Sequence, residues 1–214
     1  MMLGARTAAW SGKKLPYLRR VAYLESHGME WIDTGIIPKI GDSFYIDFAY
    51  MNESFNTKWQ QLISAGNSNY QLAFPFGSDY VIGGNGLYVR VFGGGKGYRS
   101  DTIRVPELLR DVRLVLSIES NGGLYYNIRC GSGSITETPI SEIDGTYKNL
   151  LLFRRANVGY GMFKCFGFYM IRDGVEVSNL IPVLDLSGRP CFYDEVSGQL
   201  FYNQGTGEFT WGEL

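Results

Sequence analysis

The sequence predicts an all-β protein, an antiparallel two-sheet β-sandwich of the jelly-roll type. Apolar residues alternate with polar ones along many short segments, which is the period of strands with one face on a core. Dipeptides that favour tight turns separate several of these segments. In addition, 28 of the 214 residues are glycine and 15% are aromatic, with only 7 prolines. This composition is typical of a turn-rich β protein rather than of a disordered or collagenous chain.

Alternation is clearest in four segments, 43–50, 112–119, 124–128 and 166–170. Residues two apart in a strand point to the same side of the sheet, so each segment has one predicted core-facing side. The predicted core-facing residues are Phe44, Ile46, Phe48 and Tyr50; Val112, Leu114, Leu116 and Ile118; Leu124, Tyr126 and Ile128; and Phe166, Phe168 and Met170. All four segments are therefore predicted to be strands packed on a core.

Turn-forming dipeptides separate neighbouring apolar segments at three places. They are Asn121-Gly122, Asp173-Gly174 and Ser197-Gly198. Each pair suits the positive φ of a hairpin turn, so the flanking segments are predicted to pair as antiparallel strands. The one helix candidate is 106–110, a single turn that begins with proline, which is tolerated at that position.

The chain is predicted to form one domain over 17–214, preceded by an N-terminal extension at 1–16. No linker-like stretch divides 17–214, and 45% hydrophobic residues suffice for one core. Because no window approaches 18 consecutive apolar residues, a membrane span is not expected. The first ten residues are followed by Ser-Gly-Lys-Lys at 11–14 before an apolar stretch can form. We therefore do not expect a Sec signal peptide.

Charge and cysteine content bear on partners and metal sites. Lys and Arg total 20 and Asp and Glu total 21, a net charge of −1. Proteins that follow nucleic-acid backbones concentrate basic residues, so nucleic acid is not an expected partner. Cys130, Cys165 and Cys191 are odd in number and form no Cys-x-x-Cys pair. At most one internal disulfide is predicted, with no zinc site and no cofactor.

Stretches near both ends of the chain resemble a known family. They are Leu15-Pro16, 20–26 (RVAYLES) and 31–36 (WIDTGI) near the start, and 180–182 (LIP), Asp185, Ser187-Gly188, Tyr193-Asp194, Gly198, 201–203 (FYN) and 205–209 (GTGEF) near the end. Together they resemble the opening and closing of concanavalin A-like (laminin-G-like) lectin/glucanase domains, which are common in phage, prophage and gut-bacterial proteins. The resemblance implies a sandwich with its two termini on neighbouring strands.

Domains of this fold include lectins, adhesion modules, glycosidases and virion structural proteins. The leading hypothesis is a non-enzymatic binding or adhesion module for a glycan or cell-surface polysaccharide, located at a bacterial cell surface or in a virion. The alternative is a structural virion protein, a fibre or capsid-decorating subunit. Its N-terminal extension, with Arg6, Trp10, Lys13 and Lys14, would then dock on a virion partner or on another copy in a homo-oligomer. A glycoside hydrolase is the remote third hypothesis.

Two motifs that suggest hydrolases depart from the patterns that catalysis needs. Asp33-Thr34-Gly35 matches aspartic proteases, whose two aspartates share a proton, but the chain has no second copy. A polar turn in which Asp33 accepts backbone N–H bonds is predicted instead. A glucanase of the family would resemble Glu-x-Asp-x-x-Glu on one strand. The nearest match, 142–147, has Tyr147 in place of the second Glu, so an enzyme is not expected.

Two further features are predicted to have no catalytic role. His27 is the single histidine, and no Ser/His/Asp or Cys/His arrangement is evident around it. The segment 93–101 (GGGKGYRSD) lacks the Gly-Lys-Ser/Thr ending of a phosphate loop, and no helical pattern follows it. It is predicted to be a loop between strands at one end of the sandwich, where binding residues commonly lie.

Candidate ligand-binding residues are those where aromatic side chains meet polar groups in predicted loops. A sugar needs an aromatic ring against its apolar face and polar groups for its hydroxyls. Most aromatics here are expected in the core or in cross-strand pairs. The candidates are Trp59, Tyr80, Tyr98, Arg99 and Asp101. The family resemblance allows a calcium site made of Asp and backbone oxygens, but no dense Asp/Asn cluster marks one.

Overall fold

The computed structural model describes residues 14–51, 60–66, 70–78, 85–94, 101–105, 110–121, 125–137, 149–154 and 161–214. Every regular element in these ranges is a β-strand, and none is a helix that could cross a membrane. The strands are β1 (Tyr17–Arg20), β2 (Tyr23–Glu25), β3 (Ile32–Asp33), β4 (Ser43–Tyr50), β5 (Gln60–Gly66), β6 (Tyr70–Ser78), β7 (Asn85–Gly94), β8 (Asp101–Arg104), β9 (Arg113–Asn121), β10 (Tyr125–Cys130), β11 (Gly133–Glu137), β12 (Leu151–Leu152), β13 (Phe163–Arg172), β14 (Val175–Asp185), β15 (Pro190–Asp194), β16 (Leu200–Phe201) and β17 (Thr210–Gly212).

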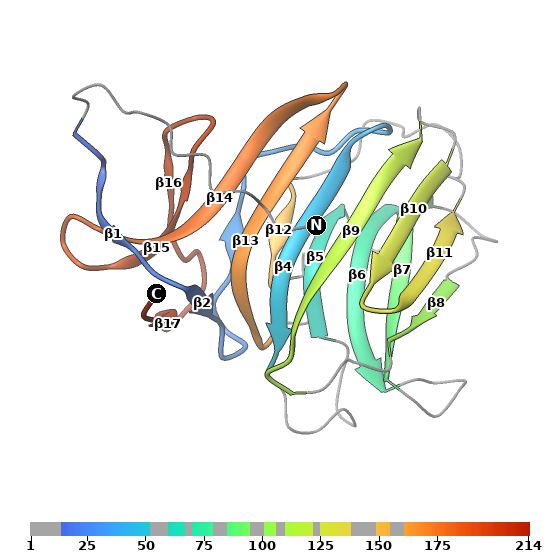
Figure 1. The fold of residues 1–214 in the computed structure, drawn as a ribbon, viewed down its shortest axis with the longest axis horizontal. Helices are drawn as coiled ribbons and strands as arrows, with labels where there is room; N and C mark the ends of the chain where they lie inside the picture. Colours follow the sequence, from blue (N-terminus) through green and yellow to red (C-terminus); the bar gives the residue numbers. More distant parts are fainter. Residues whose placement is uncertain are drawn as a thin grey trace.

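The strands form two antiparallel sheets, and Figure 1 shows the larger in front of the smaller. The larger sheet has 11 strands in the order β11-β10-β9-β4-β13-β14-β15-β16, with β1 paired to β14 and β2 paired to both β13 and β17. The smaller sheet has 6 strands in the order β3-β12-β5-β6-β7-β8. The predicted all-β, antiparallel two-sheet sandwich is confirmed, while its jelly-roll topology stays a prediction.

One hydrophobic core joins the two sheets. Phe44, Ile46 and Phe48 of β4 point to the same side, and none is more than 1% exposed. They belong to one buried cluster with Leu62 and Ile63 of β5, in the other sheet. The same cluster includes the predicted residues Tyr50, Leu114, Leu116, Ile118, Tyr126, Ile128, Phe168 and Met170. The alternation predicted for these strands is therefore confirmed.

One predicted core residue of β13 faces outward because the strand contains a bulge. The register shifts between Cys165 and Gly167. Cys165 and Phe168 are both buried, although they are three positions apart and would point to opposite sides of a regular strand. Phe166 therefore leaves the core and packs edge-on against Tyr23, with ring centres 5.5 Å apart. The prediction that Phe166 faces the core is wrong, because one extra residue interrupts the two-residue period.

A second predicted core residue, Val112, lies outside its strand. It is 36% exposed and precedes β9, which begins at Arg113. Asp111 has φ of 60°, so the chain turns there and the strand period begins only afterwards. Of the helical turn predicted at 106–110, only Arg110 is described, in an isolated β-bridge with Tyr50. Leu124 also lies outside the described residues.

The predicted hairpins are confirmed as antiparallel strand pairs. β13 and β14 meet across Asp173 and Gly174, whose φ angles of 50° and 76° are those of a type I′ turn. β15 pairs with β16 across a loop in which Gly198 has φ of 74°. β9 pairs with β10 from Asn121 opposite Tyr125.

β13 changes partner at its bulge, and a small lobe separates from the sandwich. After the bulge β13 pairs with β14, whereas before it Lys164 and Cys165 pair with β2. The last residues of β14 pair instead with β15 and β1. A second buried cluster forms there from Tyr17, Val183, Cys191 and Tyr193. We call β1, β15, β16 and residues 180–185 of β14 the side lobe. It lies on the left in Figure 1.

The two ends of the domain meet beside the side lobe. β17 pairs with β2, with Trp211 opposite Leu24. The Gln204 N–H donates to the Trp31 carbonyl (2.9 Å), and the Trp31 N–H donates to Asn203 Oδ1 (3.1 Å). The opening and closing stretches of the sequence therefore bind each other, with the neighbouring termini that the resemblance implies.

Gly205 is the tightest point of this closure, and its replacement tests how far stability depends on it. A Cβ at Gly205 would overlap the Met29 carbonyl oxygen and lie 2.8 Å from Trp31 Cδ1. We expect Gly205→Ala to lower the free energy of unfolding by about 1–3 kcal/mol, the usual cost of overpacking. Gly167→Ala is the control, because its Cβ would make an ordinary 3.5 Å contact. Equal urea midpoints for the two variants would contradict this account.

Candidate functional site

Four of the five predicted ligand-binding residues, Trp59, Tyr80, Tyr98 and Arg99, lie outside the described residues. The fifth, Asp101, begins β8, and its backbone pairs with Val89 of β7. The glycines at 93 and 94, predicted to start the preceding loop, instead end β7. A ligand site at the loop end of the sandwich stays a prediction.

A pocket of about 150 Å³ opens between the β14–β15 turn and the segment that follows β16. It is lined by Arg189, Pro190, Tyr202, Asn203, Gly205, Gly207, Glu208 and Phe209. Sites for drug-sized ligands have volumes of roughly 300–1,000 Å³. This pocket therefore suits one small group rather than an extended ligand.

Asp185 organises the turn on one side of the pocket. Its carboxylate accepts hydrogen bonds from the Ser187 N–H (2.9 Å) and hydroxyl (2.6 Å), from the Arg189 N–H (2.9 Å) and from the Tyr202 hydroxyl (3.1 Å). Burial alone would raise the pKa of Asp185, but these hydrogen bonds outweigh it and lower the pKa to about 2. Asp185 is therefore ionised at neutral pH and holds two pocket residues in place.

Arg189 lies over the ring of Tyr202 at the pocket wall. Its guanidinium carbon is 3.9 Å from the ring centre, and its Nε is 3.8 Å from Asp185 Oδ2. Cation–π attraction and the nearby carboxylate both orient the planar guanidinium. The Arg189 side chain is still 55% exposed. The pocket therefore presents an oriented guanidinium rather than a bare aromatic face.

Asn203 supports the pocket segment from within. Its Oδ1 accepts the N–H groups of Trp31 (3.1 Å) and Gly205 (2.8 Å), and its Nδ2 donates to the Gly207 carbonyl (2.9 Å). The amide oxygen thus uses both of its acceptor sites inside the protein. Asn203 acts chiefly as a structural support, with one amide N–H left for other contacts.

Glu208 supplies a second charge to the lining. It is exposed, and its carboxylate forms no hydrogen bond or ion pair within the part of the chain that the structure describes. The neighbouring Phe209 is 3% exposed and belongs to the main core. The pocket lining therefore combines the oriented guanidinium of Arg189, the unpaired carboxylate of Glu208 and the apolar side chain of Phe209.

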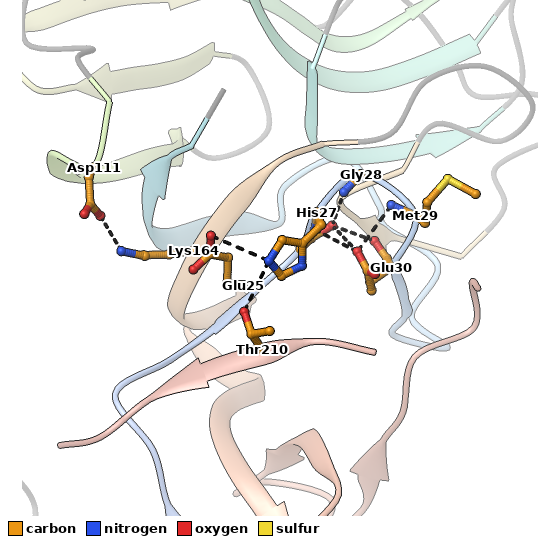
Figure 2. Close-up of polar contacts among 9 residues, drawn as sticks. Glu25, His27, Gly28, Met29, Glu30, Asp111, Lys164 and Thr210 are labelled. Atoms are coloured by element: carbon orange, nitrogen blue, oxygen red, sulfur yellow. Dashed lines mark hydrogen bonds and ion pairs between the residues drawn. The ribbon is translucent and has the colours of Figure 1, made fainter. Parts of the chain in front are cut away.

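Glu30 lies against the pocket segment at Gly207. It is 4% exposed, and its carboxylate accepts the N–H groups of His27 (2.7 Å) and Met29 (3.3 Å). A Cβ at Gly207 would lie 2.5 Å from Glu30 Oε1. The loop of the opening stretch, drawn in Figure 2, is thus packed directly against the pocket segment.

His27 belongs to this loop, and its side chain lies in a polar cluster (Figure 2). Its Nε2 is 3.9 Å from Glu25 Oε1 and 3.4 Å from Thr210 Oγ1. In a nucleophile–His–acid triad, the acid and the nucleophile contact different ring nitrogens. Here one nitrogen meets both groups, so the geometry is that of a surface contact between β2 and β17.

An ion pair between Lys164 and Asp111 completes the cluster in Figure 2, with Nζ 2.6 Å from Oδ1. The ammonium also lies 4.8 Å from the centre of the Tyr23 ring. Burial opposes the charge, but the Asp111 carboxylate outweighs it, so the pKa of Lys164 is raised. The charged Lys164 ammonium therefore contacts both the Tyr23 ring and the Asp111 carboxylate and links them.

Asp33 has the turn role that the sequence predicts. Its Oδ1 accepts the Gly35 N–H (2.8 Å), and its Oδ2 accepts an N–H of the Asn149 side chain (3.2 Å). Gly35 has φ of 67°, which glycine adopts without strain. The predicted polar turn is confirmed. The glucanase-like segment 142–147 lies outside the described residues.

Cysteine chemistry and metal ligation were also candidates for a site. Cys130, Cys165 and Cys191 are all free and buried. Burial raises the pKa of Cys165 above its usual value and that of Cys191 to about 12. No group of three or more His, Cys, Asp or Glu residues that could hold a metal ion occurs in the described ranges.

The pocket residues were not among those that the sequence singled out. Tyr202 and Glu208 belong to the closing stretch, to which the resemblance assigns only a role in the fold. Arg189 comes from a separate turn, and Asp185 brings it onto the Tyr202 ring. The available signal was the concentration of Tyr, Asn, Gln, Thr and Glu at 202–208.

Asp185→Asn tests whether the ionised carboxylate holds this turn. The pKa of Asp185 in the folded protein lies below the value of about 3.9 expected in the unfolded chain. The contribution of the carboxylate to the free energy of unfolding is therefore complete above the unfolded pKa and is lost as the pH falls towards 2. At pH 7 we expect the variant to lose about 1–3 kcal/mol of unfolding free energy. Urea unfolding between pH 7 and 2 should show the difference from wild type narrowing below pH 4. A constant difference would contradict the prediction.

Comparisons with protein-family models and with curated proteins find no match for this chain. The resemblance to concanavalin A-like domains therefore stays a prediction, based on the two terminal stretches. The function of the pocket has to be inferred from its own geometry and chemistry.

Proposed function

We propose that this protein is a non-enzymatic carbohydrate-binding or adhesion module of a phage or bacterial cell surface, and that its pocket holds one sugar unit. The main support is the combination of Arg189, Tyr202 and Glu208 around a space of about 150 Å³. Two charged side chains and an aromatic side chain meet there in a shallow cavity. The proposal also draws on the family resemblance of the two terminal stretches.

Sugar recognition needs hydrogen-bonding groups beside apolar surface. A sugar hydroxyl both donates and accepts, so a guanidinium and a carboxylate that line the same pocket can bind neighbouring hydroxyls. Phe209 and Pro190 supply apolar lining. One small pocket gives a low affinity, so useful adhesion would depend on several copies binding at once.

The contacts of the candidate catalytic residues favour binding over catalysis. Asp33 uses both carboxylate oxygens within its turn. The Glu25, His27 and Thr210 contacts share one imidazole nitrogen. We therefore expect no turnover of β-glucans or peptides, and no change in this result for Asp33→Asn or Glu142→Gln.

A glycan array probed with a multimerised form of the protein tests the proposal. We expect binding to at least one glycan class, and about 10-fold weaker binding for Arg189→Ala, because a hydrogen bond to a charged group is lost. Arg129→Ala is the matched control, since Arg129 is an exposed arginine of β10 outside the pocket. Trp59→Ala and Tyr98→Ala test the loop-end site predicted from the sequence. A folded wild-type protein that binds no glycan would refute the proposal.

The second candidate function is a structural virion subunit, and one observation favours it. Leu15, within the N-terminal extension, and Leu18, in β1, are 36% and 62% exposed. Ion pairs of Arg19 with Glu213 and of Arg20 with Glu195 fix β1 onto the domain. An extension that starts from a fixed strand with exposed leucines is suited to docking on a neighbouring subunit.

Deletion of 1–16 distinguishes the two functions. A virion subunit is expected to form a stable oligomer, such as a trimer, that dissociates when the extension is removed. Mass photometry of the full chain and of the deletion variant measures this. An unchanged oligomeric state, with glycan binding retained, would exclude the structural role of the extension.

A further inference from the structure

We infer that the pocket selects a neutral sugar, such as an uncharged hexose, over acidic sugars. This inference rests on the proposed carbohydrate-binding function and specifies the class of ligand. It follows from the charges that line the pocket and from the hydrogen-bonding groups that the protein leaves unused.

Arg189 has more donors than its protein partners can use. A guanidinium carries five N–H groups in one plane. Its polar neighbours are the carboxylate of Asp185, 3.8 Å from Nε, and the hydroxyl of Tyr202. Since the side chain is 55% exposed, the remaining N–H groups can donate to ligand oxygens without first breaking a bond inside the protein.

Glu208 supplies the complementary acceptors. Its carboxylate has no polar partner in the ranges that the structure describes, and it forms no ion pair with Arg189 across the pocket. Each of its oxygens can therefore accept from a ligand hydroxyl. A ligand with neighbouring hydroxyls can meet both residues, accepting from Arg189 and donating to Glu208.

The local charge disfavours an anionic ligand. Asp185 and Glu208 carry two negative charges near the pocket, against the one positive charge of Arg189. A sugar carboxylate that approached Arg189 would also meet the like charges of Glu208 and Asp185. An uncharged ring with several hydroxyls avoids this repulsion.

The test measures binding of methyl glucoside, methyl galactoside, methyl mannoside and glucuronate to the full chain by saturation-transfer NMR. We expect at least one neutral glycoside to bind about 10-fold more tightly than glucuronate. Glu208→Gln should weaken the binding of neutral glycosides. It should also raise the affinity for glucuronate relative to that for neutral glycosides, because one negative charge is removed. Arg189→Gln should weaken the binding of neutral glycosides and of glucuronate. Glu176→Gln, an exposed glutamate of β14 outside the pocket, is the control.

The outcomes separate this inference from the proposed function. Tighter binding of glucuronate than of every neutral glycoside would overturn the selectivity, while sugar binding itself would stand. Neutral binding that is unchanged in Glu208→Gln and Arg189→Gln would overturn the assignment to this pocket. If the folded protein binds no sugar on the panel and no glycan on an array, the proposed function fails, and the inference fails with it.

Discussion

The extra residue in β13 is the constraint on which the rest of the larger sheet depends. Cys165 and Phe168 both face the core, although side chains alternate strictly along a regular strand. The bulge at Phe166 adds one residue to the strand, so that Cys165 and Phe168 can both be buried. It also increases the local bend of the strand. β13 then pairs with β2 before the bulge and with β14 after it. The side lobe, and the pocket beside it, follow from this division of partners.

Buried carboxylates hold several turns of the domain through hydrogen bonds. Asp194 accepts the Asn179 N–H (2.7 Å) and the Ser197 hydroxyl (2.8 Å), in the same way that Asp185 and Glu30 serve their own turns. A charge can be buried when several donors surround it. Because these turns are fixed before any ligand arrives, binding would require little further ordering of the walls.

The sequence predicts the sheets better than it predicts the site. Period-two alternation identifies β4, β9 and β10 because the core-facing residues have no interruption there. It fails at Phe166, because a bulge shifts the period without any change in residue type. The pocket is harder still, since Arg189 and Tyr202 come together only through Asp185 and a loop packed against Glu30. Such contacts depend on which distant segments meet in the folded protein, and local sequence patterns do not predict this.

The buried thiols give the two hydrophobic clusters separate chemical reporters. Cys191 belongs to the cluster of the side lobe, whereas Cys130 and Cys165 belong to the main core. Only a thiolate reacts readily with an alkylating reagent, so a buried thiol is modified when its surroundings open. The labelling rate of Cys191 therefore follows opening of the lobe, and the other two rates follow opening of the sandwich. Their ratio measures whether the lobe unfolds independently of the domain that supports it.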